Sequence, residues 1–347
     1  MISAFIKAME NGHVPDSVIR LGIRKLCKQR LHDISADNLE EKEESFHKYI
    51  KDLKDGPLAV HTKEANEQHY ELPPEFFLLA LGKNLKYSSC FWDHTTNNLD
   101  AAEDLGLKIT MDRAQIQDGM RILELGCGWG SLTLAMAKRF PQSKIFAISN
   151  SAPQKAHIDA EALKRGLKNI TVLTRDISKL ESLAVELEPF DRVVSVEMFE
   201  HFKNYQELLR MVSQVLSKEG KTFIHIFTHK EYPYPFETEG EDNWMGKYFF
   251  TGGQMPSHHL LYSFQQDLAL DRSWIWDGTH YEKTSNAWLA NMDKNADVIR
   301  TIFEKTYGAE ATQWFNRWRI FFMACAELFG YDKGQEWAVS HYLFTKK

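Results

Sequence analysis

The sequence predicts an α/β protein in which a mostly parallel sheet lies between two layers of helices. Between about residues 119 and 229, short apolar runs alternate with segments of helical periodicity. A glycine-rich turn follows the first of these runs. Strands that alternate with helices require right-handed crossover connections, which place helices on both faces of the sheet.

Five apolar runs in this middle part have the length and composition of buried strands. They are Arg121–Leu125, Lys144–Ser149, Ile170–Leu173, Arg192–Val196 and Thr222–Phe227. Segments of helical period, such as Ser131–Arg139 and Ala152–Arg165, lie between them. We therefore expect the regular strand–helix order of a parallel sheet.

The flanking regions are predicted to be mainly helical. We expect residues 1–115 to form a helical N-terminal cap and residues 116–347 to form the α/β domain. The Pro-, Tyr- and Gly-rich segment Glu231–His259 is too long for an ordinary connection, so we expect an inserted lid at about residues 230–265. The elements predicted after it are strands at 268–276 and 337–345 and helices near 281–295 and 309–329.

The composition is that of a globular protein from a reducing compartment. The 347 residues carry a net charge of −6, which argues against a nucleic-acid partner. The four cysteines form no C-x-x-C pair, so neither a metal site nor a disulfide framework is predicted. We expect a cytoplasmic protein, and the sequence leaves the choice between a monomer and a homodimer open.

Stable membrane insertion is not predicted. No run approaches the roughly 18 apolar residues of a membrane span, and Ile320–Phe329 is expected to be a buried helix. The N-terminus is too charged for a signal peptide. The first 31 residues are rich in Lys and Arg, which fits either a helix on a membrane surface or, more commonly, the solvated face of a packed helix.

The strongest motif is Glu124–Gly130, ELGCGWG, directly after the first middle strand and before a helix. Its glycines allow a tight turn and a close approach of the backbone to a ligand. The E-x-G-x-G-x-G spacing differs from the G-x-G-x-x-G of a dinucleotide turn. It resembles motif I of class I S-adenosylmethionine (SAM) methyltransferases, in which Glu124, Gly126 and Gly128 would lie at the cofactor.

Candidate site residues also follow the second and third strands. Asn150 and Gln154 follow the second strand, where ribose-binding turns usually have Asp or Glu, and Asp176 and Ile177 follow the third. Taken alone, both turns are more often helix caps than ligand sites.

The fourth strand leads into Glu197, Glu200 and His201, which would share one face if the chain turns helical there. Two carboxylates and an imidazole at the carboxyl end of a central strand predict a catalytic set, because an amine must lose its proton before it can attack a methyl group.

Several motifs, in order, resemble the cyclopropane-fatty-acid synthase superfamily. They are ELPPEFF, YSSCFW, ELGCGWG, ISNSAPQ, VEMFEHFKNY and FTHKEYPYPF. The segments KYFFTGGQMPS, HYEKTSNAWLANMD and EWAVSHYLF resemble its coclaurine N-methyltransferase branch more specifically. The resemblance covers the chain after about residue 65 and implies a seven-stranded class I methyltransferase fold with SAM as cofactor.

By position, the resemblance implies catalytic roles for Glu197, Glu200 and His201. It implies cofactor contacts for Tyr87, Ser88, Gly126, Gly128, Asn150, Gln154, Asp176 and Ile177. Cyclopropane synthases hold a bicarbonate ion, and the matching positions here are Ser89, Glu200, His225 and Tyr281, with the cysteine of that set displaced to Cys90. Phe227 stands where those synthases commonly have an aliphatic residue.

The function that we expect is N-methylation of a small aromatic or heterocyclic amine. The alternatives are methyl or methylene transfer to an unsaturated acyl chain, and a SAM-binding module without catalysis. More than half of the aromatic residues lie after residue 226, which predicts an aromatic pocket for a flat cation or, alternatively, an aromatic core. The candidates for the pocket are Tyr232, Phe236, Trp244, Phe249, Phe250 and Tyr281.

Overall fold

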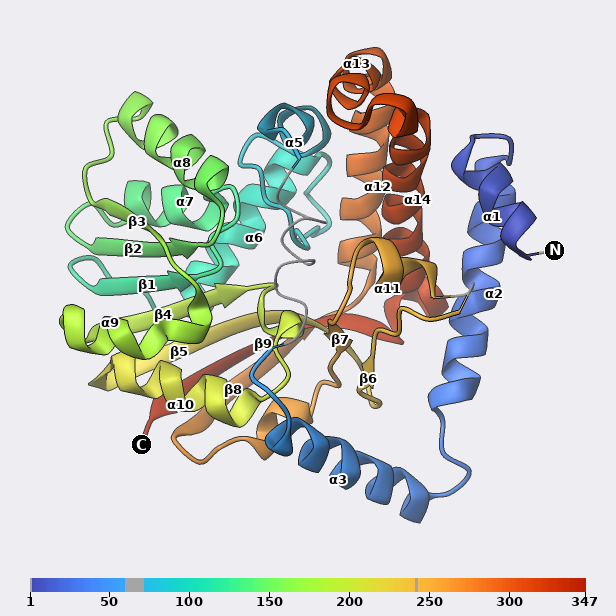
Figure 1. Ribbon diagram of the computed structural model, residues 1–347. Helices are drawn as coiled ribbons and strands as arrows, with labels where there is room; N and C mark the ends of the chain where they lie inside the picture. The colour runs from blue at the N-terminus through green and yellow to red at the C-terminus, as the bar shows by residue number, and fades with distance from the viewer. Residues whose placement is uncertain (1, 60–71, 241–242) are drawn as a thin grey trace.

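A computed structural model describes residues 2–59, 72–240 and 243–347 of the chain (Figure 1). Its centre is a seven-stranded sheet with the order β3-β2-β1-β4-β5-β9-β8. The first five strands run parallel, and β9 pairs antiparallel with both β5 and β8. The strands are β1 Arg121–Leu125, β2 Lys144–Ser149, β3 Ile170–Thr174, β4 Phe190–Val196, β5 Leu216–His229, β8 Leu268–Trp276 and β9 Trp337–Lys346. The predicted α/β class with a mostly parallel sheet is confirmed.

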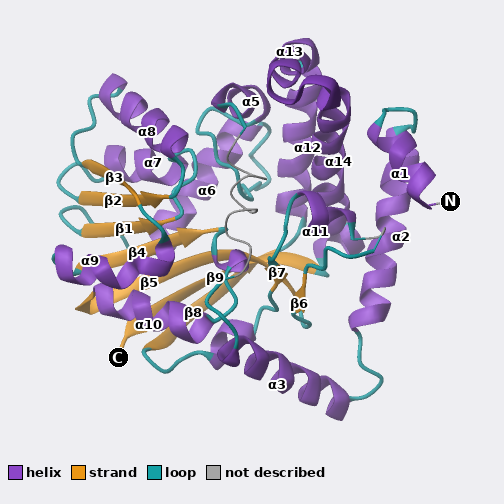
Figure 2. Ribbon diagram, viewed as in Figure 1, coloured by secondary structure: helices purple, strands orange, loops and turns teal. Residues whose placement is uncertain are grey.

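Helices cover both faces of the sheet (Figure 2). Alternate residues of one strand point to opposite faces, so Ile122 packs with α6 and α7, whereas its neighbour Leu123 packs with α9 and α10. The helices of these layers are α6 Leu99–Arg113, α7 Ser131–Arg139, α8 Ala152–Lys164, α9 Leu180–Glu186 and α10 Tyr205–Val215, and α3 Leu39–Asp55 lies beside α10. The two apolar layers leave the carboxyl ends of the parallel strands as the accessible edge.

A second helical unit lies beyond this edge of the sheet (Figure 1). It contains α1 Ile2–Glu10, α2 Asp16–Ile34, α5 Pro74–Ala80, α11 Trp244–Tyr248, α12 Thr279–Lys294, α13 Ala296–Tyr307 and α14 Ala311–Phe329. Its core is strongly aromatic, with Trp288, Trp318 and Phe322 almost fully buried. The helix predicted at Ile320–Phe329 is thus the second half of a longer buried helix, α14.

The basic N-terminal helix is packed against the C-terminal unit. Within α2, Ile19 and Cys27 are buried, and Arg20 and Arg24 pair with Glu327 of α14 at 2.8 and 2.6 Å. Part of its positive charge is therefore used inside the protein, which favours the packed-helix interpretation over a membrane-surface helix. Among the residues described, no helix is long and apolar enough to cross a bilayer.

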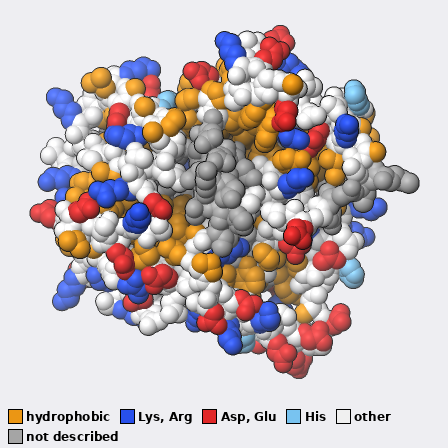
Figure 3. All heavy atoms as spheres, in the orientation of Figure 1, with side chains coloured by type: hydrophobic (Ala, Val, Ile, Leu, Met, Phe, Trp, Pro, Cys, Tyr) orange, Lys and Arg blue, Asp and Glu red, His pale blue; other side chains and the backbone are white. Residues whose placement is uncertain are grey.

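The segment after β5 begins with the short strands β6 Tyr234–Pro235 and β7 Gln254–Met255, which form a two-stranded ribbon around α11. Residues 241–242 of the predicted lid and Glu71 of the ELPPEFF motif lie outside the described residues. On the face shown in Figure 3, hydrophobic side chains lie on either side of the central grey segment, and many of the charged side chains lie toward the edge.

Candidate active site

The glycine-rich turn after β1 contains three glycines with positive φ, at 77° for Gly126, 51° for Gly128 and 83° for Gly130. A Cβ atom on Gly126 would lie 2.8 Å from Met198 Cγ, and one on Gly130 would lie 2.6 Å from Ile158 Cγ1. A Cβ atom on Gly128 would meet no atom within 4 Å. Two glycines are thus required by packing, whereas the third faces open space.

That open space is a cleft at the carboxyl ends of β1 and β4. Of the predicted site residues, those that line it are Tyr87, Ser88, Glu124, Gly126, Gly128 and Glu197. It is also lined by Lys86 and Trp129, which sequence reasoning did not single out. The strand ends, the turn and the segment before α6 therefore form one cavity.

The other four predicted cofactor residues follow β2 and β3 at the same edge of the sheet but do not line this cleft. Gln154 is 2% exposed, and its Oε1 accepts from Ser149 Oγ at 2.7 Å. Its Nε2 has no hydrogen-bond partner among the described residues. Asp176 is exposed and caps a short turn by accepting from Ser178 N at 2.8 Å, as the capping alternative predicts, while Asn150 and Ile177 occupy the adjoining turns.

Two buried ionisable side chains border the cleft. Glu124 is 3% exposed and accepts a hydrogen bond from Thr133 Oγ1 at 2.5 Å, and burial raises its pKa to about 8. Lys86 is 1% exposed, and its Nζ donates to Ser88 Oγ and to the Ser89 carbonyl at 2.5 and 2.6 Å. Lys86 thereby fixes the backbone that faces Glu197.

The expected helical face for Glu197, Glu200 and His201 is wrong. The chain turns helical only at Phe199–His201, in a single 3₁₀ turn, and Glu197 precedes it with a positive φ of 46°. A residue other than Gly rarely adopts this backbone conformation, so Glu197 must be held in it by its surroundings. Glu197 instead reaches the site from the end of β4, where its charge influences both Glu200 and His201.

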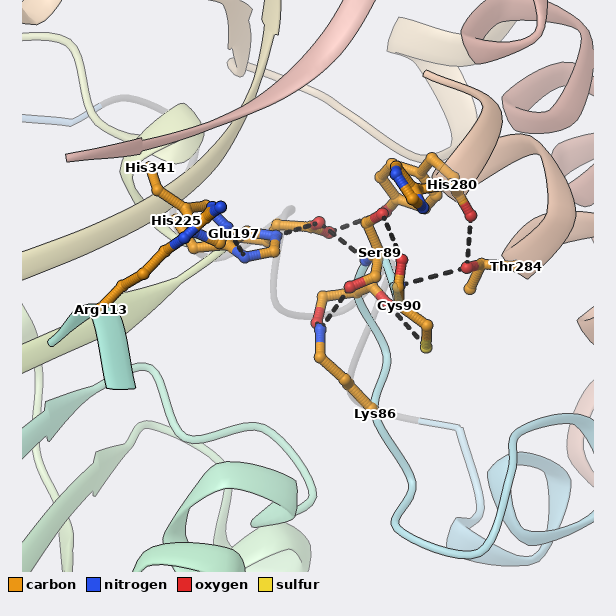
Figure 4. Close-up of polar contacts among 11 residues, drawn as sticks. Lys86, Ser89, Cys90, Arg113, Glu197, His225, His280, Thr284 and His341 are labelled. Carbon is orange, nitrogen blue, oxygen red and sulfur yellow. Dashed lines mark hydrogen bonds and ion pairs between the residues drawn. The ribbon is translucent and has the colours of Figure 1, made fainter. Parts of the chain in front are cut away.

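The carboxylate of Glu197 is the centre of a hydrogen-bond cluster (Figure 4). Its Oε1 accepts from Ser89 N at 2.9 Å and lies 3.2 Å from His225 Nε2, and its Oε2 accepts from Tyr281 Oη at 2.7 Å. The side chain is 8% exposed. Burial raises the pKa of Glu197, and Lys86, the Ser89 amide and the Tyr281 hydroxyl offset part of this rise by stabilising the carboxylate.

Three of the four residues that the resemblance assigns to bicarbonate meet at Glu197 and not at Glu200, Ser89 through its backbone amide. Ser89, His225 and Tyr281 all contact the Glu197 carboxylate, whereas no hydrogen bond joins any of them to Glu200. Cys90 is fully buried, and burial raises the pKa of its thiol to about 12. A protein carboxylate therefore occupies the centre of this set.

Glu200 differs from Glu197 in its surroundings. It is 1% exposed, and its Oε2 has no hydrogen-bond partner among the described residues. Burial, and then the nearby charge of Glu197, raise the pKa of Glu200 well above its ordinary value. Burial lowers the pKa of His201 to about 4, so its imidazole is neutral near pH 7. A carboxylate oxygen without a donor and with a raised pKa is suited to accept a proton.

A line of aromatic rings extends from His201 to Tyr281. Between ring centroids, His201 lies 5.9 Å from Phe250, on which it stacks. Phe250 lies 5.7 Å from Phe227, and Phe227 lies 6.2 Å from Phe329. Phe329 stacks on Tyr281 at 4.3 Å. We call these three phenylalanines, Phe227, Phe250 and Phe329, the aromatic wall. Only Phe250 was among the candidates predicted for the pocket.

The remaining aromatic candidates have other partners. Phe236 packs behind Phe250 at 5.2 Å. Phe249 is fully buried against Phe321, and Trp244 donates to Glu10 Oε1 at 2.8 Å, so both belong to the core between α11 and α14. Tyr232 packs on His229 at 5.8 Å. The core interpretation is thus correct for Phe249 and Trp244.

The cleft fits a small charged cofactor with a polar and an apolar part. The backbone at Gly128 leaves room where a side chain would project, and Gln154 offers a buried amide donor nearby in the fold. No cluster of three or more His, Cys, Asp or Glu that could hold a metal ion occurs in the part of the chain that the structure describes.

Comparison with known proteins identifies relatives over the whole chain. A family model described as mycolic acid cyclopropane synthetase matches residues 59–337. (S)-Coclaurine N-methyltransferase of Thalictrum flavum subsp. glaucum is 36% identical over 352 residues, which cover 100% of this chain and 96% of that enzyme. The cyclopropane-fatty-acyl-phospholipid synthase of Escherichia coli strain K12 is 30% identical over 79% of this chain and 66% of that enzyme.

The structural comparison agrees. A crystal structure of coclaurine N-methyltransferase bound to N-methylheliamine and SAH superimposes with a TM-score of 0.95 at 36% identity and covers 99% of both chains. The motif resemblance and the class I methyltransferase fold are confirmed, and SAM is the cofactor. The chain belongs to the mycolic acid cyclopropane synthetase family and is a SAM-dependent methyltransferase.

Proposed function

We propose that the chain methylates the nitrogen of a small aromatic or heterocyclic amine of benzylisoquinoline type. The observation that carries this proposal is the position of Glu200, whose buried and unpartnered Oε2 belongs to the same short turn as His201, which stacks on the aromatic wall. Relatives that match over the full length support it, because they are named as coclaurine and pavine N-methyltransferases.

In this proposal SAM, when bound in the cleft, supplies an electrophilic methyl group. Glu200 accepts the proton that an ammonium substrate must lose, because only the neutral amine carries a free electron pair. His201 and Phe250 present flat faces against which an aromatic amine can be oriented. Glu197 contributes negative charge next to the nitrogen, which keeps or gains positive charge as the methyl group is transferred.

The aromatic wall has a second role in this scheme. Aromatic faces stabilise a cation by about 0.5–2 kcal/mol each, depending on desolvation. Phe227 is 4% exposed and lies in the middle of the wall, between Phe250 and Phe329. The product ammonium would thus be enclosed by rings on one side and by carboxylates on the other.

The proposal is tested with SAM that carries a label on its methyl group. The labelled SAM is offered in parallel to benzylisoquinoline-type secondary and tertiary amines and to vesicles of unsaturated phospholipid. We expect label in the amine fraction alone. Label in the lipid fraction alone would contradict the proposal and favour transfer to an acyl chain. SAM binding without transfer to either acceptor would favour a binding module without catalysis.

A further inference from the structure

A chain of hydrogen bonds leads from the outer layer of the protein to Glu197. Arg113, the last residue of α6, places Nη1 2.9 Å from His341 Nδ1. His341 Nε2 lies 2.8 Å from His225 Nδ1, and His225 Nε2 lies 3.2 Å from Glu197 Oε1. The four residues come from α6, β9, β5 and the end of β4, and Figure 4 shows them in one line.

The two histidines are held in place by the sheet. His225 and His341 are direct partners in the antiparallel pairing of β5 and β9, and both are fully buried. The indole ring of Trp276 packs on His341 at 4.3 Å and on His225 at 5.4 Å. Neither ring can turn without displacing its neighbours, so the order of contacts along the chain is fixed.

The chemistry of Arg113 determines which atoms carry protons. A guanidinium group donates hydrogen bonds and accepts none, so His341 Nδ1 must be the acceptor. His341 therefore carries its proton on Nε2 and donates it to His225 Nδ1. His225 in turn carries its proton on Nε2, which faces the carboxylate of Glu197. Every hydrogen bond in the chain points toward Glu197.

We propose that Arg113, His341 and His225 are positioning residues that hold Glu197 as an oriented carboxylate by fixing the tautomers of both histidines. They act through Glu197 and do not touch the methyl donor or the acceptor. The effect on catalysis rests on the proposed function. The assignment of the histidine tautomers is independent of that function.

The surroundings are consistent with neutral histidines. Burial lowers the pKa of both His225 and His341 well below the ordinary value, and Arg113 adds to this effect in each case. Glu197 is faced by titratable or charged groups from five other elements or segments. They are Lys86 and Cys90 before α6, Glu200 and His201 in the 3₁₀ turn, His225 of β5, Tyr281 of α12 and Cys325 of α14. His341 of β9 and Arg113 of α6 lie behind His225, and Arg272 of β8 acts on Arg113.

The direct test is the tautomeric state of the two histidines in the full chain. Nitrogen NMR of histidine-labelled protein distinguishes Nε2–H, Nδ1–H and imidazolium rings, and the signals are assigned from their loss in His225→Gln and His341→Gln. We expect both rings to be neutral Nε2–H tautomers between pH 6 and 8. An Nδ1–H tautomer or an imidazolium at either position would overturn the proposal.

The kinetic test separates positioning from a structural role. Arg113→Met keeps an apolar stem beside Trp274 and removes the donor; Arg272→Met is the matched control, because Arg272 covers the same ring at 5.4 Å but has no place in the chain. With the best amine substrate, we expect Arg113→Met to lower kcat about tenfold with SAM affinity unchanged, the effect of one hydrogen bond to a charged group. We expect the acidic limb of the kcat profile to move upward by about one pH unit, since a carboxylate that loses a donor is more easily protonated.

Rescue at His341 provides a second discrimination. A glutamine side chain can accept from Arg113 and donate to His225, whereas leucine can do neither. His341→Gln should therefore retain more activity than His341→Leu, at equal thermal stability. Equal kinetics of these two variants, or an unchanged pH profile in Arg113→Met, would overturn the proposal. If the wild-type chain methylates no amine, the proposed function fails, and the NMR spectra still decide whether the tautomers are fixed.

Discussion

At the scale of single residues, Glu197 and Glu200 differ in what surrounds them although only two residues separate them. Glu197 accepts from a backbone amide and from Tyr281 and lies against His225, whereas one oxygen of Glu200 has no partner in the described part of the chain. A carboxylate that is already saturated with donors is a poor proton acceptor, and one that is not is a better one. We therefore assign orientation and charge to Glu197 and proton transfer to Glu200.

Replacement of Glu200 by Gln tests this division. Glu200→Gln should lower kcat by about 10²–10⁴-fold, the usual contribution of a general base, and leave the Kd for SAM within about twofold of wild type. Turnover assays and calorimetry measure the two quantities. The control is Glu207→Gln, which should keep wild-type turnover. Glu207 lies in the first turn of α10, and its carboxylate is paired with Arg210. Full turnover in Glu200→Gln would show that the proton leaves by another route.

At the scale of elements, the glycines of the turn between β1 and α7 have different roles. Packing requires Gly126 and Gly130, whereas Gly128 faces the cleft. Gly128 and Gly166 both have positive φ, and a Cβ atom at either would meet nothing within 4 Å, but only Gly128 lines the cleft. Alanine in the left-handed region costs about 1–2 kcal/mol at either position. Both variants should thus lose similar thermal stability, while Gly128→Ala alone should bind SAM at least about tenfold more weakly. Equal SAM affinity in the two variants, measured by calorimetry, would place the cofactor elsewhere.

The lid offers a second test at this scale. Phe250→Leu removes the ring that stacks on His201, and Tyr232→Leu removes a lid ring that packs on His229 instead. If the aromatic wall stabilises a cationic product, Phe250→Leu should lower kcat/KM for the amine about tenfold, within the range of one cation–aromatic contact. Tyr232→Leu should have little effect. Steady-state kinetics with one amine compare the two, and equal losses would indicate a general disturbance of the lid.

The sequence is informative about elements wherever periodicity is strong. All five middle strands are found, although β4 and β5 begin earlier than predicted, at Phe190 and Leu216. Helix α13, Ala296–Tyr307, was not predicted, because only Asn295 separates it from α12 and neither Gly nor Pro marks the break. Its amphipathic pattern, with Ile299 and Phe303 buried, was the available signal.

The candidate site was predictable only where it is local in sequence. The turn at Gly126–Gly130 and the residues around Glu197 follow from the strand–turn pattern. The roles of Arg113 and His341 depend on contacts across the fold, so no spacing reveals them. The positive φ of Glu197, which separates it from the turn that holds Glu200, is likewise set by tertiary contacts.

At the scale of the whole molecule, buried carboxyl groups link stability to pH. The pKa of Glu124 is raised by burial to about 8 from an ordinary value of 4.5. Between these two values the folded state binds more protons than the unfolded state, so the free energy of unfolding falls as pH rises through this range and levels off above it. Glu124→Gln removes this dependence while its amide oxygen can still accept from Thr133.

Urea unfolding without SAM at several values between pH 5 and pH 9 measures the effect. The stability of Glu124→Gln relative to wild type should increase up to about pH 8 and then remain constant. Glu188→Gln serves as the control, because that carboxyl group is 78% exposed at the surface. A pH-independent difference between Glu124→Gln and wild type would mean that Glu124 is ionised at every pH tested.

Strand β9 lies between β5 and β8, yet it is the last strand in the order of the sequence. Among the described residues β8 pairs only with β9, so during synthesis it has no neighbour in this sheet until residues 337–346 have been made. His341, which contacts His225 beside Glu197, arrives with the same strand. A ribosome-bound chain can therefore form β1 to β5 and the glycine-rich turn early, but it cannot complete the hydrogen-bond chain to Glu197 before β9 emerges. The pairing of β9 therefore completes the sheet and brings His341 to His225 in a single folding step.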